Sequence, residues 1–94
     1  MFTVRAAITL KGPEQGGSLG PAKSGMKHSF DFNNQLAACE VISDEGLEVF
    51  PTDQSTRVII RLPYADQLGW KLQDGSEFTL SAGAQAVALG KVIP

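Results

Sequence analysis

The sequence predicts an all-β fold, either a sandwich or a small closed antiparallel barrel. Apolar residues recur at every second position in most segments, which is the spacing of strands with one buried face. Six or seven short segments of this kind, joined by glycine-rich turns, are typical of these two architectures. A chain of 94 residues with 43% hydrophobic residues can fill one core, so we interpret residues 1–94 as a single domain.

The first strand is expected at residues 2–11, where every even position from Phe2 to Leu10 is apolar. Gly12-Pro13 ends this strand, because proline removes a backbone donor from the ladder. A long surface loop is expected at 12–26, since this stretch holds five of the ten glycines and two of the five prolines. Further strands are expected at 27–32, 36–42, 47–50, 56–62, 77–81 and 85–93.

Turns connect these strands, and small residues lie within the last one. Ser43-Asp44-Glu45-Gly46 and Asp74-Gly75 have the composition of tight turns. The one candidate helix, at 64–72, follows Pro63 and contains a glycine, so we expect at most a short turn there. Small residues at 86–90 would let the backbones of neighbouring strands approach closely in a narrow barrel.

Composition and charge argue against several classes of protein. A net charge of −2 and a pI near 5.2 lack the basic excess that is typical of nucleic-acid-binding proteins. The single cysteine, Cys39, cannot form an internal disulfide, and we expect it to fill the core as a small apolar side chain. One cysteine and one histidine are too few ligands for a zinc site, and we expect no metal and no cofactor. The alternating N-terminus lacks the apolar run of a signal peptide or membrane helix, so a cytoplasmic protein without membrane contacts is expected.

Two patterns that suggest enzyme chemistry are not supported by their surroundings. Residues 17–24 come within one residue of a phosphate-binding loop, but Ala22 replaces its second glycine, and a strand is expected where a helix should follow. Ser81, His28 and Asp31 have the residue types of a catalytic triad, but no strained nucleophile turn or oxyanion loop accompanies them. His28 shares a strand face with two phenylalanines, so we interpret it as a partly buried structural residue. We therefore expect no catalytic site and no bound nucleotide.

Three segments of the chain share their order and spacing with one known family. They are Glu14-Gln15-Gly16-Gly17 followed by Pro21, Gly25 and the Phe30/Phe32 pair, then Glu45–Val49, and then Phe78–Gly90. In these segments the chain resembles the C-terminal β-barrel domain (domain three) of bacterial elongation factor Tu. The resemblance implies that this chain is a stand-alone version of that domain. The resemblance runs from Phe2 to Ile93 with one insertion, and it implies a closed six-stranded antiparallel barrel with Greek-key character. In that family the domain contacts a second barrel, the GTPase domain, aminoacyl-tRNA and the nucleotide-exchange factor.

The departures from the family fall where tRNA would be contacted. Ser18-Leu19 replace an Arg-His pair of the family, and the run 81–85 has lost the family's arginines. Only Lys27 keeps the charge of a family arginine. We therefore expect a non-catalytic binding module for a protein partner or for a second copy of itself. The alternative is tRNA binding through a residual basic patch of Lys23, Lys27 and His28. A third hypothesis is a small-molecule pocket on the face that would meet a GTPase domain. The candidate contact residues are Lys23, Lys27, His28, Arg57, Arg61 and Gly83.

Two pairs of side chains have more than one interpretation. Tyr64 and Trp70 flank the insertion relative to the family, and aromatic residues are frequent in binding hot spots. Core packing is the more common role of such residues, and it is the role we expect here. Arg57 and Arg61 bracket Ile59 on a presumed outer face, where they form either a partner-facing patch or an ordinary barrel exterior.

Overall fold

The computed structural model describes residues 2–12, 22–64 and 72–94, and the regular structure in these ranges is entirely β-strand. The described strands, in chain order, are β1 (Phe2–Leu10), β2 (Met26–Phe32), β3 (Gln35–Ser43), β4 (Ser55–Leu62), β5 (Glu77–Ala82) and β6 (Gln85–Val92). Across the same ranges there is no helix with the length and apolar character needed to cross a membrane.

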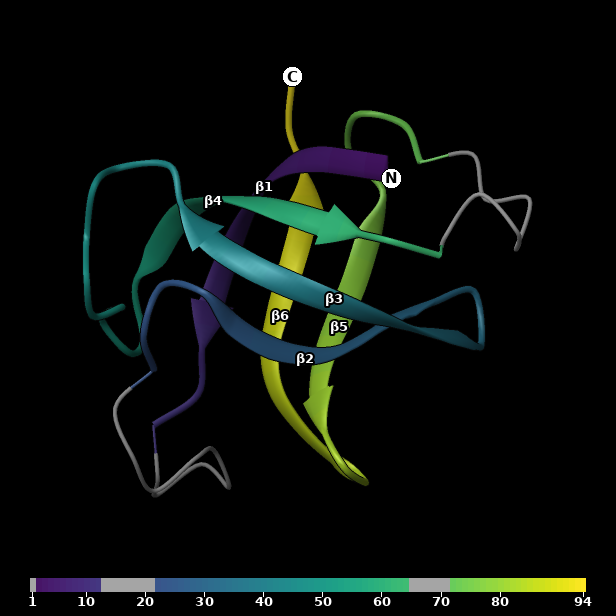
Figure 1. Cartoon of the computed structure of the whole chain (residues 1–94), viewed down its shortest axis with the longest axis horizontal. Coiled ribbons are helices and arrows are strands. Elements are labelled where there is room, and N and C mark those ends of the chain that lie inside the picture. The colour runs from purple at the N-terminus through teal and green to yellow at the C-terminus, as the bar shows by residue number, and fades with distance from the viewer. Residues whose placement is uncertain (1, 13–21, 65–71) are drawn as a thin grey trace.

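The strands close into a barrel in the order β1-β4-β3-β2-β5-β6, and all neighbouring pairs are antiparallel. Strands β2, β3 and β4 are successive neighbours, whereas β1 lies beside β4 and reaches β2 through the long connection that starts at Lys11. This is a Greek-key order. In Figure 1, β2, β3 and β4 cross in front of β5 and β6. The all-β closed barrel with six strands is therefore confirmed, and the sandwich alternative does not hold.

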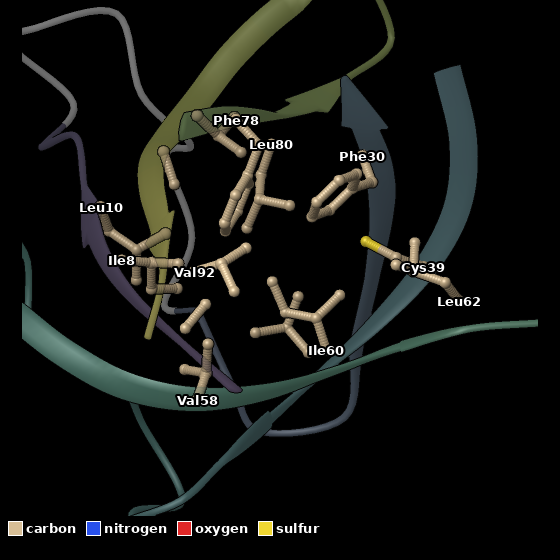
Figure 2. Close-up of a cluster of buried hydrophobic side chains, with 14 of the residues drawn as sticks. Ile8, Leu10, Phe30, Cys39, Val58, Ile60, Leu62, Phe78, Leu80 and Val92 are labelled. Carbon is tan, nitrogen blue, oxygen red and sulfur yellow. The ribbon is translucent and has the colours of Figure 1, made fainter. Parts of the chain in front are cut away.

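Side chains alternate between the inside and the outside of the barrel along each strand. In β4, for example, the even-numbered residues from Thr56 to Leu62 are buried, and those between them are exposed or half-buried. The rings of Phe30 on β2 and Phe78 on β5 stack in the interior, with centroids 4.4 Å apart and an interplanar angle of 24°. Figure 2 shows the buried side chains converging there. The buried apolar residues are Ala6, Ile8, Leu10, Phe30, Ala37, Cys39, Val41, Phe50, Val58, Ile60, Leu62, Phe78, Leu80, Val87, Ala88 and Val92.

The expected close approach at the small residues 86–90 occurs at Gly90. This residue is the cross-strand partner of Phe78, and a Cβ placed on Gly90 would lie 2.3 Å from the Cζ atom of the Phe78 ring. The group nearest to this position is an aromatic side chain, whereas the sequence suggested the backbone of a neighbouring strand. Glycine is needed at this position because any larger residue would displace the ring.

The strand expected at 47–50 is wrong. Val49 makes only an isolated antiparallel bridge, with Lys23. The Oγ atom of Ser43 accepts a hydrogen bond from the backbone N–H of Leu47 at 3.0 Å, so the chain curls into a turn as soon as β3 ends. The segment 47–50 therefore lies beside the connection that leads into β2, and it does not form a strand of the barrel.

The expected core packing of Tyr64 is also wrong, because 62% of this residue is exposed. Tyr64 follows Pro63 just beyond the end of β4, where the chain has left the barrel wall. Trp70 and most of the short turn expected at 64–72 lie outside the described residues, as do residues 13–21 of the expected surface loop. The described end of that loop is a turn that contains Gly25 and leads into β2.

Candidate functional site

An open groove of about 770 Å³ lies where β2, β3 and the end of β4 meet the β5–β6 turn. Its lining residues are Lys27, His28, Ser29, Ala38, Cys39, Glu40, Arg61, Pro63, Tyr64, Ser81, Ala82 and Gly83, and we call it the β2–β4 groove. It brings together four predicted contact residues: Lys27, His28, Arg61 and Gly83. Because these residues come from distant parts of the sequence, the groove exists only in the folded barrel.

Three charged residues form one row across the outer face of the groove. Lys27 on β2 is the cross-strand partner of Glu40 on β3, and Glu40 is the partner of Arg61 on β4. Residues directly opposite one another in antiparallel strands have Cβ atoms about 4.5–5.5 Å apart, so their side chains are neighbours on one face of the sheet. The neighbours of Glu40 in β3, Cys39 and Val41, are buried, which leaves Glu40 on the outer side.

The charges in this row are not balanced. The Nη1 atom of Arg61 donates to the Oε1 atom of Glu40 at 3.2 Å, with the two side chains 42% and 31% exposed. A pair this exposed contributes at most about 1 kcal/mol to stability, so its main effect is to orient both side chains. Lys27 forms no ion pair with any described residue, since the ion pairs in those ranges are Arg61–Glu40 and Arg5–Asp44.

His28 and Cys39 are cross-strand partners on the inward side of β2 and β3. Burial lowers the pKa of His28 from its ordinary value, so the imidazole is neutral at pH 7. Burial raises the pKa of the Cys39 thiol to about 11, against the opposing effect of a backbone hydrogen bond from His28. The expected partial burial of His28 and the expected core position of Cys39 are both confirmed.

Gly83 is explained by the geometry of the turn that it begins. It is the first residue of the two-residue loop between Ala82 and Gln85, and its φ of 62° is favourable for glycine and unfavourable for most other residues. Gly83 therefore brings exposed main chain to the groove. Nearby, Ser81 on β5 is the cross-strand partner of Ser29 on β2, so two hydroxyl-bearing residues lie side by side in the lining.

The structure places the other two predicted contact residues elsewhere. Lys23 lines a separate hollow together with Leu47 and Val49. Arg57 shares the outer face of β4 with Arg61 but lies four residues away, about 13 Å along the strand. The residual basic patch suggested by the sequence, Lys23, Lys27 and His28, is therefore divided, because Lys27 and His28 line the groove and Lys23 lines the separate hollow.

Ser81, His28 and Asp31, which have the residue types of a catalytic triad, do not lie together at one site. His28 and Ser81 line the β2–β4 groove, whereas Asp31 lines another hollow. Asp31 is three residues from His28 on β2, so the two side chains leave opposite faces of the strand. Within 2–12, 22–64 and 72–94, no group of three His, Cys, Asp or Glu residues is placed to hold a metal ion.

The segment that resembles a phosphate-binding loop is described only at its end. Ser24 accepts a hydrogen bond at its Oγ atom from the backbone N–H of Ser43, at 2.9 Å. The strand β2 begins at Met26, in agreement with the expectation that no helix follows this segment. Residues 17–21 lie outside the described residues.

A second hollow of about 700 Å³ lies on β1, β5 and β6, beside the turn between β2 and β3. Its charged residues are Asp31, Glu77 and Lys91, one positive against two negative. The β2–β4 groove has two positive residues, Lys27 and Arg61, against one negative. The two hollows therefore differ in the sign of their charge.

The other groove residues were not among the predicted contact residues, and Glu40 and Tyr64 are the most important of those that were missed. The alternation of β3 signals that Glu40 points outward, between two apolar neighbours. The sequence does not signal that Arg61 lies opposite Glu40, because this contact depends on the register between β3 and β4.

The fold and the groove define this protein as a small closed Greek-key β-barrel with an open, mixed-charge groove on its wall. No protein-family model matches the chain, and no curated protein matches its sequence significantly. The relation to the C-terminal barrel of elongation factor Tu therefore stays a prediction.

Proposed function

We propose that this chain is a non-catalytic binding module that holds a partner protein in the β2–β4 groove. The observation that carries the proposal is the gathering of Lys27, His28, Arg61 and Gly83 at one open site with Tyr64 on its rim. Tyrosine and arginine provide much of the binding energy in protein interfaces, because they combine a large contact area with a polar group. An exposed tyrosine in the same groove as an arginine is the kind of surface that a partner covers.

The distribution of charge favours a protein partner over tRNA. Nucleic-acid binding depends on several cations that follow the phosphate backbone. The groove offers Lys27 and Arg61 with Glu40 between them, whereas Lys23 and Arg57 lie outside it. The net charge of the chain, −2, adds no general attraction for phosphate. Binding of tRNA is the competing function, and it has the weaker support.

The resemblance to the elongation factor Tu barrel supports a binding role of this kind. The Greek-key order agrees with the resemblance, and the corresponding domain of the family works through contacts with other domains and with RNA. A role connected with translation and a cytoplasmic location are part of the same proposal.

Site-specific photocrosslinking tests the proposal. A photoreactive phenylalanine analogue replaces Tyr64, and the protein is irradiated in an extract of its source organism. The crosslinked protein is identified, purified and titrated against the isotope-labelled chain. We expect the amide NMR signals of residues 27–29, 38–40 and 81–83 to shift, because these segments line the groove.

Leu36 provides the matched control position. It is 62% exposed, as Tyr64 is, and it does not line the groove. The same crosslinks from both positions, or NMR shifts confined to the second hollow, would contradict the proposal. Crosslinks between two copies of the chain identify the partner as the protein itself. Shifts at the groove with bulk tRNA and with no protein would favour RNA binding.

A further inference from the structure

The row of charges in the β2–β4 groove is short of one negative charge. Glu40 lies between Lys27 and Arg61 in the strand register and accepts a hydrogen bond from Arg61 at 3.2 Å. Two cations therefore flank a single carboxylate, which pairs with Arg61, and Lys27 has no ion-pair partner among the described residues. A ligand that brings a carboxylate to this row would supply the missing charge.

Neutral hydrogen-bond donors lie beside the charged row. Ser29 and Ser81 are cross-strand partners, and both line the groove. A serine hydroxyl donates to a carboxylate, and hydrogen bonds to an ionised acceptor are stronger than those between neutral groups. A bound carboxylate would thus find hydroxyl donors as well as cations.

Apolar surface lies in the same groove. Ala38 is the cross-strand partner of Ser29 and is exposed, and Pro63 and Tyr64 follow the end of β4. These three residues offer a surface for one apolar side chain of a ligand, next to the charged row where the ligand carboxylate would bind. The groove therefore combines an excess of positive charge with an aromatic contact surface.

We propose that the groove binds a short acidic segment of the partner protein. One carboxylate of this segment lies against Lys27 and Arg61, and an adjacent apolar side chain lies on Tyr64 and Ala38. This inference rests on the proposed function and adds the chemistry of the partner to it. A basic segment is disfavoured in the groove because Glu40 is already engaged with Arg61. The second hollow, which has an excess of negative charge, would suit a basic segment better.

Fluorescence anisotropy with three synthetic peptides tests this inference. The peptides carry a neutral fluorophore and differ only in a central Asp-Phe, Asn-Phe or Lys-Phe pair in a Gly-Ser background. We expect the whole chain to bind the Asp-Phe peptide about two- to fivefold more tightly than the Asn-Phe peptide, and the Lys-Phe peptide most weakly. Salt raised from about 0.15 M to about 0.5 M should weaken only the binding of the Asp-Phe peptide, because salt screens exposed charges.

Two variants of the charged row should change the affinity for the Asp-Phe peptide in opposite directions. Lys27→Ala should weaken binding of the Asp-Phe peptide about two- to fivefold, whereas Glu40→Gln should strengthen it by a similar factor, because it frees Arg61 and removes a repelling charge. The matched control is Lys91→Ala, because Lys91 lies opposite Glu77 as Lys27 lies opposite Glu40, but it lines the second hollow. We expect Lys91→Ala to leave binding unchanged. Thermal unfolding verifies that each variant folds, and Lys27→Gln replaces Lys27→Ala where it does not.

Several outcomes would overturn the inference. They are no binding of the Asp-Phe peptide, equal or tighter binding of the Lys-Phe peptide, and weaker binding after Glu40→Gln. Bulk tRNA that binds more tightly than the Asp-Phe peptide and loses affinity in Lys27→Ala would replace the acidic segment with a nucleic acid. If the peptides fail but crosslinking at Tyr64 still captures a protein that Leu36 does not, the acidic chemistry is wrong and the binding module stands. If the crosslinks from Tyr64 and Leu36 are the same, the proposed function itself fails.

Discussion

The aromatic ring of Phe78 lies over Gly90, its partner on the neighbouring strand, in the space that a side chain at position 90 would fill. The ring also stacks on Phe30 at a centroid distance of 4.4 Å, so it is held from both sides inside the barrel. An aromatic side chain that covers a cross-strand glycine shields the glycine backbone from water and fixes the register of the two strands. The contact therefore links β2, β5 and β6 at one point of the core.

Gly90→Ala should destabilise the protein by about 1–3 kcal/mol, because the new methyl group overlaps the Phe78 ring and overpacks the core. The free energy of unfolding from urea titration measures this effect. Introducing Gly90→Ala into a Phe78→Leu background provides the control, and we expect a smaller penalty there because the ring is absent. An alanine variant as stable as the original chain would show that the ring moves aside without cost.

The β2–β3 hairpin depends on two asparagines with positive φ angles. Asn33 and Asn34 have φ of 55° and 63°, and they form the two-residue loop between Phe32 and Gln35. Asparagine tolerates this conformation, whereas a β-branched residue does not. We expect Asn34→Val to lower the free energy of unfolding by about 1–2 kcal/mol and Asn34→Gly to preserve it. Leu36→Val, on the exposed face of the adjacent strand, should have little effect in the same denaturation experiment.

The stability of the protein should depend on His28 in mildly acidic solution. The folded-state pKa of His28 is lowered by burial, so the unfolded chain takes up a proton first as the pH falls. The contribution of His28 is therefore complete above its ordinary pKa of about 6.5 and decreases as the pH falls from there towards the lowered folded-state pKa. We expect the Tm of the original chain to fall from pH 7.5 to about pH 5.5. His28→Gln should flatten this dependence, since the chain has no other histidine. An unchanged pH profile in the variant would contradict the assignment.

Cys39 should be unreactive in the folded protein. The thiol is buried with 4% exposure, and its pKa of about 11 leaves almost no thiolate at pH 8. We expect Ellman's reagent to modify Cys39 at pH 8 only as fast as the protein unfolds, and rapidly in denaturant. The double variant Cys39→Ala, Ala38→Cys moves the thiol to the exposed side of the same strand, where it should react at once.

Local patterns were sufficient to predict most of the strands. The alternation of Val58, Ile60 and Leu62 predicts both the position of β4 and its buried face, and the structure confirms both. The two-residue repeat is a local property, because successive side chains of a strand point to opposite faces whatever the strand pairs with. The same reasoning failed at 47–50, where the Ser43 hydroxyl binds the backbone N–H of Leu47 and closes a turn in place of a strand.

Half-burial of His28 and burial of Cys39 followed from the residues around them in the sequence, and the all-β fold followed from the repeat itself. Only the tertiary structure decided that Lys27, Glu40 and Arg61 form one row, and that Lys23 lies apart from them. The physical reason is that the row depends on the register of β2 with β3 and of β3 with β4, and the pattern within any one strand does not contain the register of its pairing. The tertiary structure also shows that β4 ends at Leu62, which leaves Tyr64 exposed and outside the core.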